Sequence, residues 1–263
     1  MAIVGFIGTG NMGGALARAA AKSGLAEELL LANRSPEKAL RLAGELGGRQ
    51  VDNQEAAARS DVLFLGVKPQ MLDTLLGQIG DTLKDRNERQ LIVSMMAGKD
   101  LQTLQRLLGE DKPILRIMPN IPVCVGAGVT LYCGSGAVTE EDKDFFCRLM
   151  AASGLVEELD EHLMEAASGV TGCGPAFAAM FVEALADGAV ACGLPRKQAI
   201  AYAAQMLAGS ARMLLASGEH PGVLKDRVCS PAGSTIQGVR KLEELAFRAA
   251  VTDAVIATWE KEF

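Results

Sequence analysis

Aromatic and histidine side chains are scarce in this chain. Phe, Trp and Tyr together make up 4% of its 263 residues, and only His162 and His220 are histidines. A core with few aromatic rings has to be built from Ala, Leu, Val and Met. Neither histidine stands in a motif typical of a catalytic base or of a metal ligand. We therefore expect an aliphatic core and no metal site.

Closely spaced cysteine pairs are absent as well. The six cysteines show no C-x-x-C spacing and lie in apolar stretches, at Cys124, Cys133, Cys147, Cys173, Cys192 and Cys229. Such cysteines are typical of the reduced thiols of a cytosolic protein, and they argue against a zinc site.

Long apolar runs and basic clusters are also missing. No stretch reaches the roughly 20 apolar residues of a membrane helix, and the N-terminus lacks the basic segment of a signal peptide. Lys and Arg number 26 against 32 Asp and Glu, which gives a net charge of -6. This charge repels nucleic acid and anionic membranes. We expect a cytoplasmic protein that has neither of them as a partner.

A glycine-rich turn near the N-terminus is the clearest positive signal. An apolar run over 2–7 leads into it, and a helical pattern follows at once. The turn reads Gly8, Thr9, Gly10, Asn11, Met12, Gly13. In G-x-G-x-x-G the glycines permit a tight turn, a close approach of a pyrophosphate and close packing of helix on strand. An ordinary strand-to-helix turn is the alternative, but the apolar run at 29–32 completes a βαβ unit. We predict a dinucleotide site.

The end of the second strand lacks the acid that NAD-binding proteins place about 20 residues beyond the glycine turn. Asn33, Arg34 and Ser35 stand there instead. A carboxylate repels a 2′-phosphate, whereas arginine pairs with it and Asn and Ser donate hydrogen bonds. Ser35 also suits the N-cap of a helix that begins at Pro36, and the two roles can coexist. The pattern favours NADP over NAD.

Strand and helix patterns alternate up to about residue 160. We predict strands at 2–7, 29–33, 62–67, 91–95, 114–118, 127–132 and 155–159, and a weak one near 49–51. Helices are predicted at 12–23, 36–46, 54–59, 70–79, 99–108 and 139–152. This alternation indicates an α/β fold with a parallel, doubly wound sheet of Rossmann type. Part of the sheet is expected to be antiparallel, because only a Pro- and Gly-rich link joins 114–118 to 127–132.

Only helical patterns remain beyond about residue 160. They lie at 160–168, 175–192, 195–216, 221–227 and from about 235 to the end. We predict a nucleotide-binding domain over 1–158 and an all-helical domain over 159–263. Residues 175–192 are apolar on nearly all sides except at Glu183 and Asp187, so a second subunit is expected to cover one wall. The two acids form a hydrated seam or a catalytic pair, and the seam is favoured.

Residues at the ends of later strands complete the predicted cofactor site, because ligands of open α/β folds bind at the carboxyl edge of the sheet. The candidates are Asn53, Val67, Lys68, Pro69, Met96 and Ala97. The stiff loop 118–122 follows the next strand. It either positions a nicotinamide or only turns the chain.

A second helix start suited to anions is predicted in the helical part. Small residues open into a helical pattern there, with Gly233, Ser234 and Thr235 at its beginning. N–H groups at such a start bind anions, although a serine or threonine also serves as a plain N-cap.

These motifs resemble those of pyrroline-5-carboxylate reductases over essentially the whole chain. The most specific match is 228–243, which is similar to the family signature V-x-S-P-G-G-x-T-I-x-G-L-x-x-L-E. The stretches 67–69, 118–120 and 174–176 also look like family motifs. The chain departs from the family at Ala232, where the signature has glycine, and at Cys173, Phe177 and Ile121, where the family usually has Ser, Tyr and Thr.

The resemblance implies hydride transfer from NADPH, with NADH as the weaker alternative, to the C=N bond of 1-pyrroline-5-carboxylate, giving L-proline. It implies that Gly233, Ser234 and Thr235 bind the substrate, with Thr235 as the catalytic residue. It also implies a homo-oligomer, a dimer or a ring of dimers, held by the helical domain. The imine can enter protonated from solution, so the protein supplies mainly geometry and charge.

Two other functions remain open. A 3-hydroxyacid dehydrogenase would place an asparagine four residues after a lysine of the helical domain. Here the residue four positions after Lys197 is Ala201, and no asparagine occurs after Asn120. A dinucleotide-binding sensor would bind NADPH without oxidising it with any imine.

Overall fold

The computed structural model describes residues 1–86 and 88–260. The chain divides into two compact units, Met1–Gly172 and the part from Cys173 onward. Every strand of the described residues lies in the first unit, and the second unit is helical.

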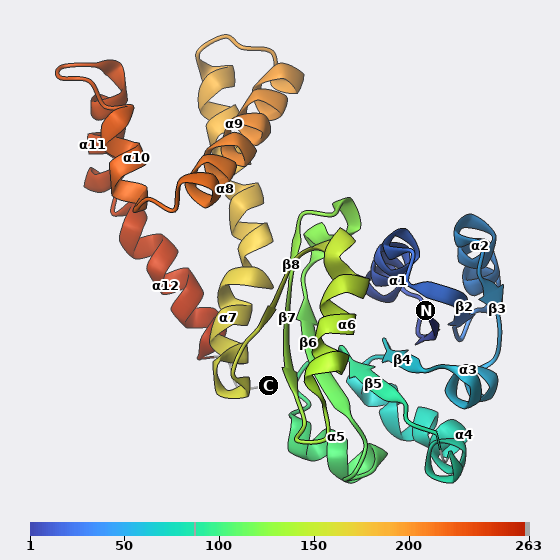
Figure 1. Ribbon diagram of the computed structural model, residues 1–263. Helices are drawn as coiled ribbons and strands as arrows, with labels where there is room; N and C mark the ends of the chain where they lie inside the picture. The colour runs from blue at the N-terminus through green and yellow to red at the C-terminus, as the bar shows by residue number, and fades with distance from the viewer. Residues whose placement is uncertain (87, 261–263) are drawn as a thin grey trace. The chain divides into compact units, whose positions relative to one another are not determined.

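The first unit is built on one eight-stranded sheet with the order β3-β2-β1-β4-β5-β6-β7-β8 (Figure 1). Its strands are β1 (Ala2–Ile7), β2 (Ala26–Ala32), β3 (Arg49–Gln50), β4 (Val62–Leu65), β5 (Leu91–Ser94), β6 (Ile114–Pro119), β7 (Gly128–Gly134) and β8 (Gly154–Glu158). Only β6 and β7 pair antiparallel; all other neighbours are parallel. The order reverses between β1 and β4, which is the switch point where such sheets bind ligands. The predicted fold class is confirmed.

Helices cover both faces of this sheet, and they create two separate cores. The helices are α1 (Asn11–Ser23), α2 (Pro36–Leu46), α3 (Asn53–Arg59), α4 (Leu72–Asp85), α5 (Leu101–Leu108) and α6 (Glu140–Met150). Alternate strand residues enter different cores: Phe6 and Phe64 pack with α1, α2 and α6, whereas Ile7 and Leu65 pack with α3, α4 and α5. Burial on both faces explains why the strands read as continuous apolar runs.

The few aromatic rings of the first unit gather in the core beneath α1 and α6. Phe6 stacks on Phe64 with ring centroids 4.4 Å apart. Phe146 lies 6.4 Å from Phe64 and meets Tyr132 edge-on. The core on the other face is aliphatic apart from its sulfur-containing side chains.

Helix α7 (Met164–Thr171) belongs to the first unit, so the division falls after Gly172 rather than at the expected 158/159. Met164 is fully buried in the core, and Arg116 of β6 is paired with Glu161 at 3.0 Å and Glu165 at 2.6 Å. Burial disfavours the charged guanidinium, but the hydrogen bonds it donates to the two carboxylates outweigh this and raise the pKa of Arg116. Helical periodicity does not show which unit a helix packs on.

The second unit contains α8 (Gly174–Ala191), α9 (Arg196–Ser217), α10 (Pro221–Arg227), α11 (Ser234–Glu244) and α12 (Phe247–Trp259). The prediction of one helix from about 235 to the end is wrong. The chain breaks at Ala246, which takes a left-handed conformation with φ 56° and donates its N–H to the carbonyl of Glu243 at 3.0 Å. Neither glycine nor proline marks this break, and left-handed alanine is uncommon.

Two helical segments are long and apolar enough to cross a membrane by length and composition, Glu161–Ala191 and Arg196–Ser217. This differs from the expectation that no such stretch exists. The observation is weak evidence for a membrane, because core helices of soluble proteins pass the same test. In the most apolar 18-residue stretch of each segment, only 11% is buried within this chain. The helical unit therefore presents apolar surface that something else must cover.

Candidate functional site

The glycine turn after β1 has the geometry that a pyrophosphate requires. Gly8 has φ 97°, and a Cβ at Gly13 would lie 2.2 Å from the carbonyl oxygen of Gly8, so helix α1 can approach the strand only without a side chain there. A Cβ at Gly10 would meet nothing within 4 Å. No side chain of the described residues caps the start of α1, and its first turn has no acid. Backbone N–H groups and the helix dipole thus face open space suited to an anion.

A groove of about 500 Å³ opens beside this turn, and its lining adds positive charge. Residues 9–12 form one wall, and the cations Arg18, Lys38 and Arg41 form part of another. Arg18 makes a bidentate ion pair with Glu45 at 2.6 and 2.7 Å, which ties α1 to α2. The hydroxyl of Thr9 is buried and has no hydrogen-bond partner among the described residues. The donors and the cations fit a dinucleotide phosphate.

The end of β2 places Asn33, Arg34 and Ser35 at the carboxyl edge of the sheet. The Asn33 side chain donates to the carbonyl of Ser35 at 3.2 Å, which shapes the turn into α2. Ser35 occupies the N-cap position of α2, but its hydroxyl makes no capping hydrogen bond. Arg34 is exposed and forms no ion pair within the described parts of the chain. The side chains of Arg34 and Ser35 therefore remain available for a ligand.

A smaller pocket of about 280 Å³ lies between the start of α2, β3 and the start of α3. Asn33, Val51 and Asn53 are among its lining residues. Asn53 is held by a hydrogen bond of 2.7 Å from its amide to Gln78. Asp52 caps α3 by accepting from the N–H of Glu55 at 2.7 Å. The position beyond the glycine turn and next to Arg34 suits the adenosine half of a dinucleotide.

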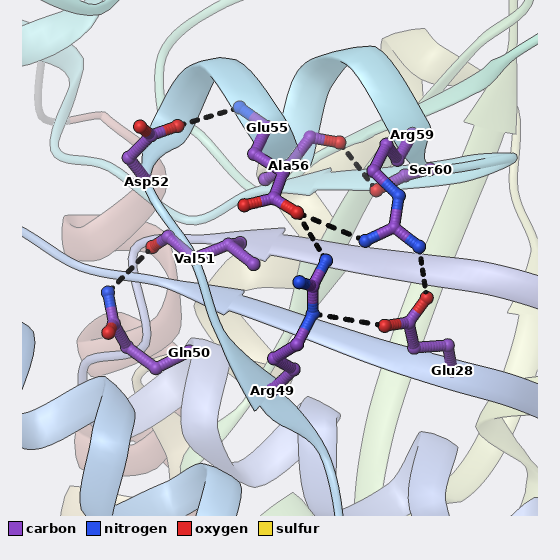
Figure 2. Close-up of polar contacts among 9 residues, drawn as sticks. All are labelled: Glu28, Arg49, Gln50, Val51, Asp52, Glu55, Ala56, Arg59 and Ser60. Carbon is purple, nitrogen blue, oxygen red and sulfur yellow. Dashed lines mark hydrogen bonds and ion pairs between the residues drawn. The ribbon is translucent and has the colours of Figure 1, made fainter.

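A network of four charged side chains joins strands and a helix next to this pocket, and Figure 2 shows its contacts. Arg49 of β3 and Arg59 of α3 both pair with Glu28 of β2, at 3.1 and 2.6 Å, and both also pair with Glu55. The side chains are partly exposed, so each pair contributes little alone. Together they connect β2, β3 and α3. Of these elements, β3 and α3 contribute lining residues to the pocket.

The end of β4 approaches the glycine turn through its backbone. A Cβ at Gly8 would lie 2.5 Å from the carbonyl oxygen of Gly66, and the N–H of Gly66 donates to Ile7 at 2.7 Å. Gly66 was missed as a site residue, although a glycine directly after a buried strand was the available signal. Val67, Lys68 and Pro69 follow it, with Lys68 exposed.

Two residues after β5 differ in what they can offer a cofactor. Met96 is 2% exposed, and its side chain packs in the core with α3, α4 and α5. Only its backbone can face a ligand. Ala97 is exposed at the same edge.

The loop after β6 has a structural role that the sequence left open. Asn120 is buried; its side chain donates to the carbonyl of Thr171 at 2.9 Å and accepts from the N–H of Val129 at 2.8 Å. It therefore joins β6, β7 and the end of α7. The following residues Ile121, Val123 and Cys124 line the groove beside the glycine turn.

The start of α11 in the second unit has no side-chain cap among the described residues. Gly233 is its N-cap residue, no side chain in the described chain caps it, and its first turn has no acid. The alternative of a plain cap by Ser234 or Thr235 is therefore not what the structure shows. The N–H groups here and the Thr235 hydroxyl are available to a small anion.

One of the two acids of α8 has an ion-pair partner in the second unit. Asp187 pairs with Arg196 of α9, and both are about half exposed. Glu183 and Asp187 border an apolar groove of about 1090 Å³ between α8 and α9. The hydrated seam therefore stays a prediction. No group of three or more His, Cys, Asp or Glu in the described residues is arranged to hold a metal ion.

Comparison with known proteins covers both units. Residues 3–98 match the family model "NADP oxidoreductase coenzyme F420-dependent", and residues 161–262 match "Pyrroline-5-carboxylate reductase dimerisation". The chain is 42% identical to pyrroline-5-carboxylate reductase of Escherichia coli K12 over 98% of its length and 96% of the relative. It is 40% identical to human pyrroline-5-carboxylate reductase 2, with 97% and 81% covered.

Solved structures agree with these matches. A pyrroline-5-carboxylate reductase from Coxiella burnetii superposes with a TM-score of 0.91 at 29% identity, covering 98% of this chain and 96% of the other. The Plasmodium falciparum pyrroline carboxylate reductase, solved with NADP bound, gives 0.85 at 30% identity, covering 98% and 96%. The predicted resemblance is confirmed: this chain belongs to the pyrroline-5-carboxylate reductase family and is an NADP-binding oxidoreductase with a dimerisation domain.

Proposed function

We propose that the chain reduces 1-pyrroline-5-carboxylate to L-proline with NADPH, using residues 8–13 and 233–235 as the two anion sites. The observation that carries this assignment is the uncapped start of α11, which offers N–H donors and a hydroxyl without a protein partner in the described chain. A dinucleotide site alone would suit many oxidoreductases. A second anion site in the dimerisation domain suits a small carboxylate substrate.

The cofactor supplies the hydride, and the chain orients and charges the substrate. The N–H groups of Gly233, Ser234 and Thr235 hold the carboxylate, while the Thr235 hydroxyl hydrogen-bonds the ring nitrogen. The nitrogen arrives protonated as an iminium, needs no proton from the protein during hydride transfer, and leaves as an amine that takes up a proton from solvent. No histidine is needed: His220 accepts from the N–H of Gly222 at 3.1 Å, and His162 lines a pocket beside Arg116.

The phosphate-bearing half of the cofactor distinguishes NADPH from NADH in this proposal. Arg34 pairs with the 2′-phosphate, and Asn33 and the uncapped hydroxyl of Ser35 donate to it. Asn53 would face the adenine-side ribose, and residues 67–69, 96 and 97 would hold the cofactor further along the edge of the sheet. Met96 takes part only through its backbone, because its side chain is buried.

The test is the loss of NADPH absorbance on adding 1-pyrroline-5-carboxylate to the purified chain. We expect turnover with this imine and formation of L-proline. A 3-hydroxyacid substrate reducing NADP in its place would favour the dehydrogenase alternative, and NADPH binding without any turnover would favour the sensor.

Homo-oligomerisation follows from the dimerisation domain, and we propose a dimer or a ring of dimers that shares its active sites across subunits. The supporting surface lies on the helical unit, where Met180, Tyr202 and Leu215 are 67%, 60% and 84% exposed in the single chain. Side chains of this size are normally covered. The same cover accounts for the two apolar segments without a membrane, and we propose a cytoplasmic location with no nucleic-acid partner.

Sedimentation velocity at micromolar concentration should show no appreciable monomer. Burial of the apolar helix faces is expected to make the interface large and hydrophobic. A stable, fully active monomer under these conditions would remove the shared-site proposal.

A further inference from the structure

The turn before α11 carries an alanine where the backbone geometry suits glycine. The N–H of Gly233 donates to the carbonyl of Ser230 at 3.0 Å, which closes a β-turn with Pro231 and Ala232 at its centre. Ala232 has φ 58°. Proline holds the preceding φ negative, so a positive φ at the next residue makes this a type II turn. Glycine or asparagine is the usual residue at that position.

Alanine makes this turn harder to populate than glycine would. The same hydrogen bond closes a type I turn if the peptide between Pro231 and Ala232 flips, and both residues then have negative φ. Relative to glycine, the Cβ of alanine disfavours the left-handed conformation by about five- to thirtyfold. Ala232 is exposed, so packing of its methyl group within this chain does not offset the strain.

The turn determines how the substrate-binding N–H groups are presented. Gly233 is both the last residue of the turn and the N-cap of α11. A Cβ at Gly233 would lie 2.4 Å from the hydroxyl of Ser230, so the first and last residues of the turn are in close contact. A flipped peptide changes the direction of the Ala232 N–H and of the Pro231 carbonyl directly beside this helix start.

We infer that Ala232 is a positioning residue that weakens substrate and product binding by reducing the population of the turn that receives the carboxylate. The inference rests on the proposed function, in which residues 233–235 hold that carboxylate. Apparent affinity falls by the fraction of molecules in the binding-competent state. The imine and L-proline carry the same carboxylate, so the affinity for both must fall by the same factor. The affinity for NADPH must stay unchanged.

Ala232→Gly is the direct test in the full-length oligomer. The KM for 1-pyrroline-5-carboxylate and the inhibition constant of added L-proline should both fall by the same factor, at most about five- to thirtyfold. The KM for NADPH should not change. Ala232→Asn should give intermediate values of both constants, because asparagine tolerates positive φ better than alanine does.

Ala246→Gly is the matched control. Ala246 is also an exposed alanine with positive φ, at 56°, but it lies between α11 and α12, away from the substrate turn. Relief of its strain should raise Tm without changing either constant. If Ala232→Gly likewise raised Tm and left both constants unchanged, Ala232 would carry only structural strain. A rise in the two constants would equally overturn the inference.

Thr235→Ala separates this inference from the proposed function. Loss of activity in Thr235→Ala together with unchanged constants in Ala232→Gly would retain the substrate site and reject the role of Ala232. Wild-type kinetics in both variants would reject the substrate site itself, and the inference with it.

Discussion

Thr235→Ala is expected to lower kcat/KM for 1-pyrroline-5-carboxylate by about 10- to 100-fold, from a lost hydrogen bond of roughly 1.5–3 kcal/mol. The carboxylate has the same charge before and after hydride transfer, so holding it contributes mainly binding and orientation. The ring nitrogen changes from iminium to amine, so a hydroxyl bonded to it can act on the transition state. Steady-state kinetics with saturating NADPH measure the effect, and NADPH binding and Tm should be unchanged.

Ser234→Ala is the neighbouring control. The proposed contribution of Ser234 is its main-chain N–H, which alanine retains. The hydroxyl of Ser234 makes no capping hydrogen bond at the start of α11. Ser234→Ala should therefore lower kcat/KM much less than Thr235→Ala does. Wild-type turnover by Thr235→Ala would show that this loop only begins a helix and does not bind the substrate. The groove beside Ile121 and Cys124 would then become the next candidate for the substrate site.

Arg34→Ala is expected to weaken NADPH binding by roughly 1.5–3 kcal/mol, the range of a charge-assisted hydrogen bond. NADH binding should be almost unaffected, because NADH lacks the 2′-phosphate. The side chain is exposed and makes no ion pair within the described chain, so its removal should leave Tm nearly constant. Titration with each cofactor, followed by fluorescence or calorimetry, measures the difference.

Arg106→Ala is a matched control for charge. Arg106 is also exposed, but it lies in the last turn of α5, and helices of parallel α/β units run back toward the opposite edge of the sheet. It should reduce the long-range attraction for both cofactors slightly and equally. Equal losses of NADPH and NADH affinity in Arg34→Ala would remove Arg34 from the phosphate site.

The alternation of strands and helices was readable from the sequence because its causes are local. Strands buried on both faces appear as apolar runs, and the glycines at 8, 10 and 13 report steric needs of one short turn. All eight strands were predicted with at least one end within one residue of the structure. The helices at 36–46 and 221–227 match α2 and α10.

Only the tertiary structure decided features that depend on contacts distant in sequence. The periodicity of α7 could not show that Arg116, from another part of the chain, pairs with Glu161 and Glu165 and holds the helix on the sheet. Met96 looked like a strand-end residue facing a cofactor, but packing from the helices on one face buries its side chain. Gly66 meets Gly8 through the pairing of β4 with β1.

The backbone conformations of two alanines also lay beyond sequence reasoning. Positive φ is expected at glycine and not at alanine, so the residue type does not predict it at Ala246, and at Ala232 the only signal was the glycine of the family signature. The closing hydrogen bond to Ser230 and the fixed φ of Pro231 define the first, and the junction of two helices defines the second. The sequence by itself thus determined the fold class and the cofactor turn, because these follow from local sterics and burial patterns. The tertiary structure decided which helix belongs to which unit and how the substrate turn is strained, because those depend on contacts between segments.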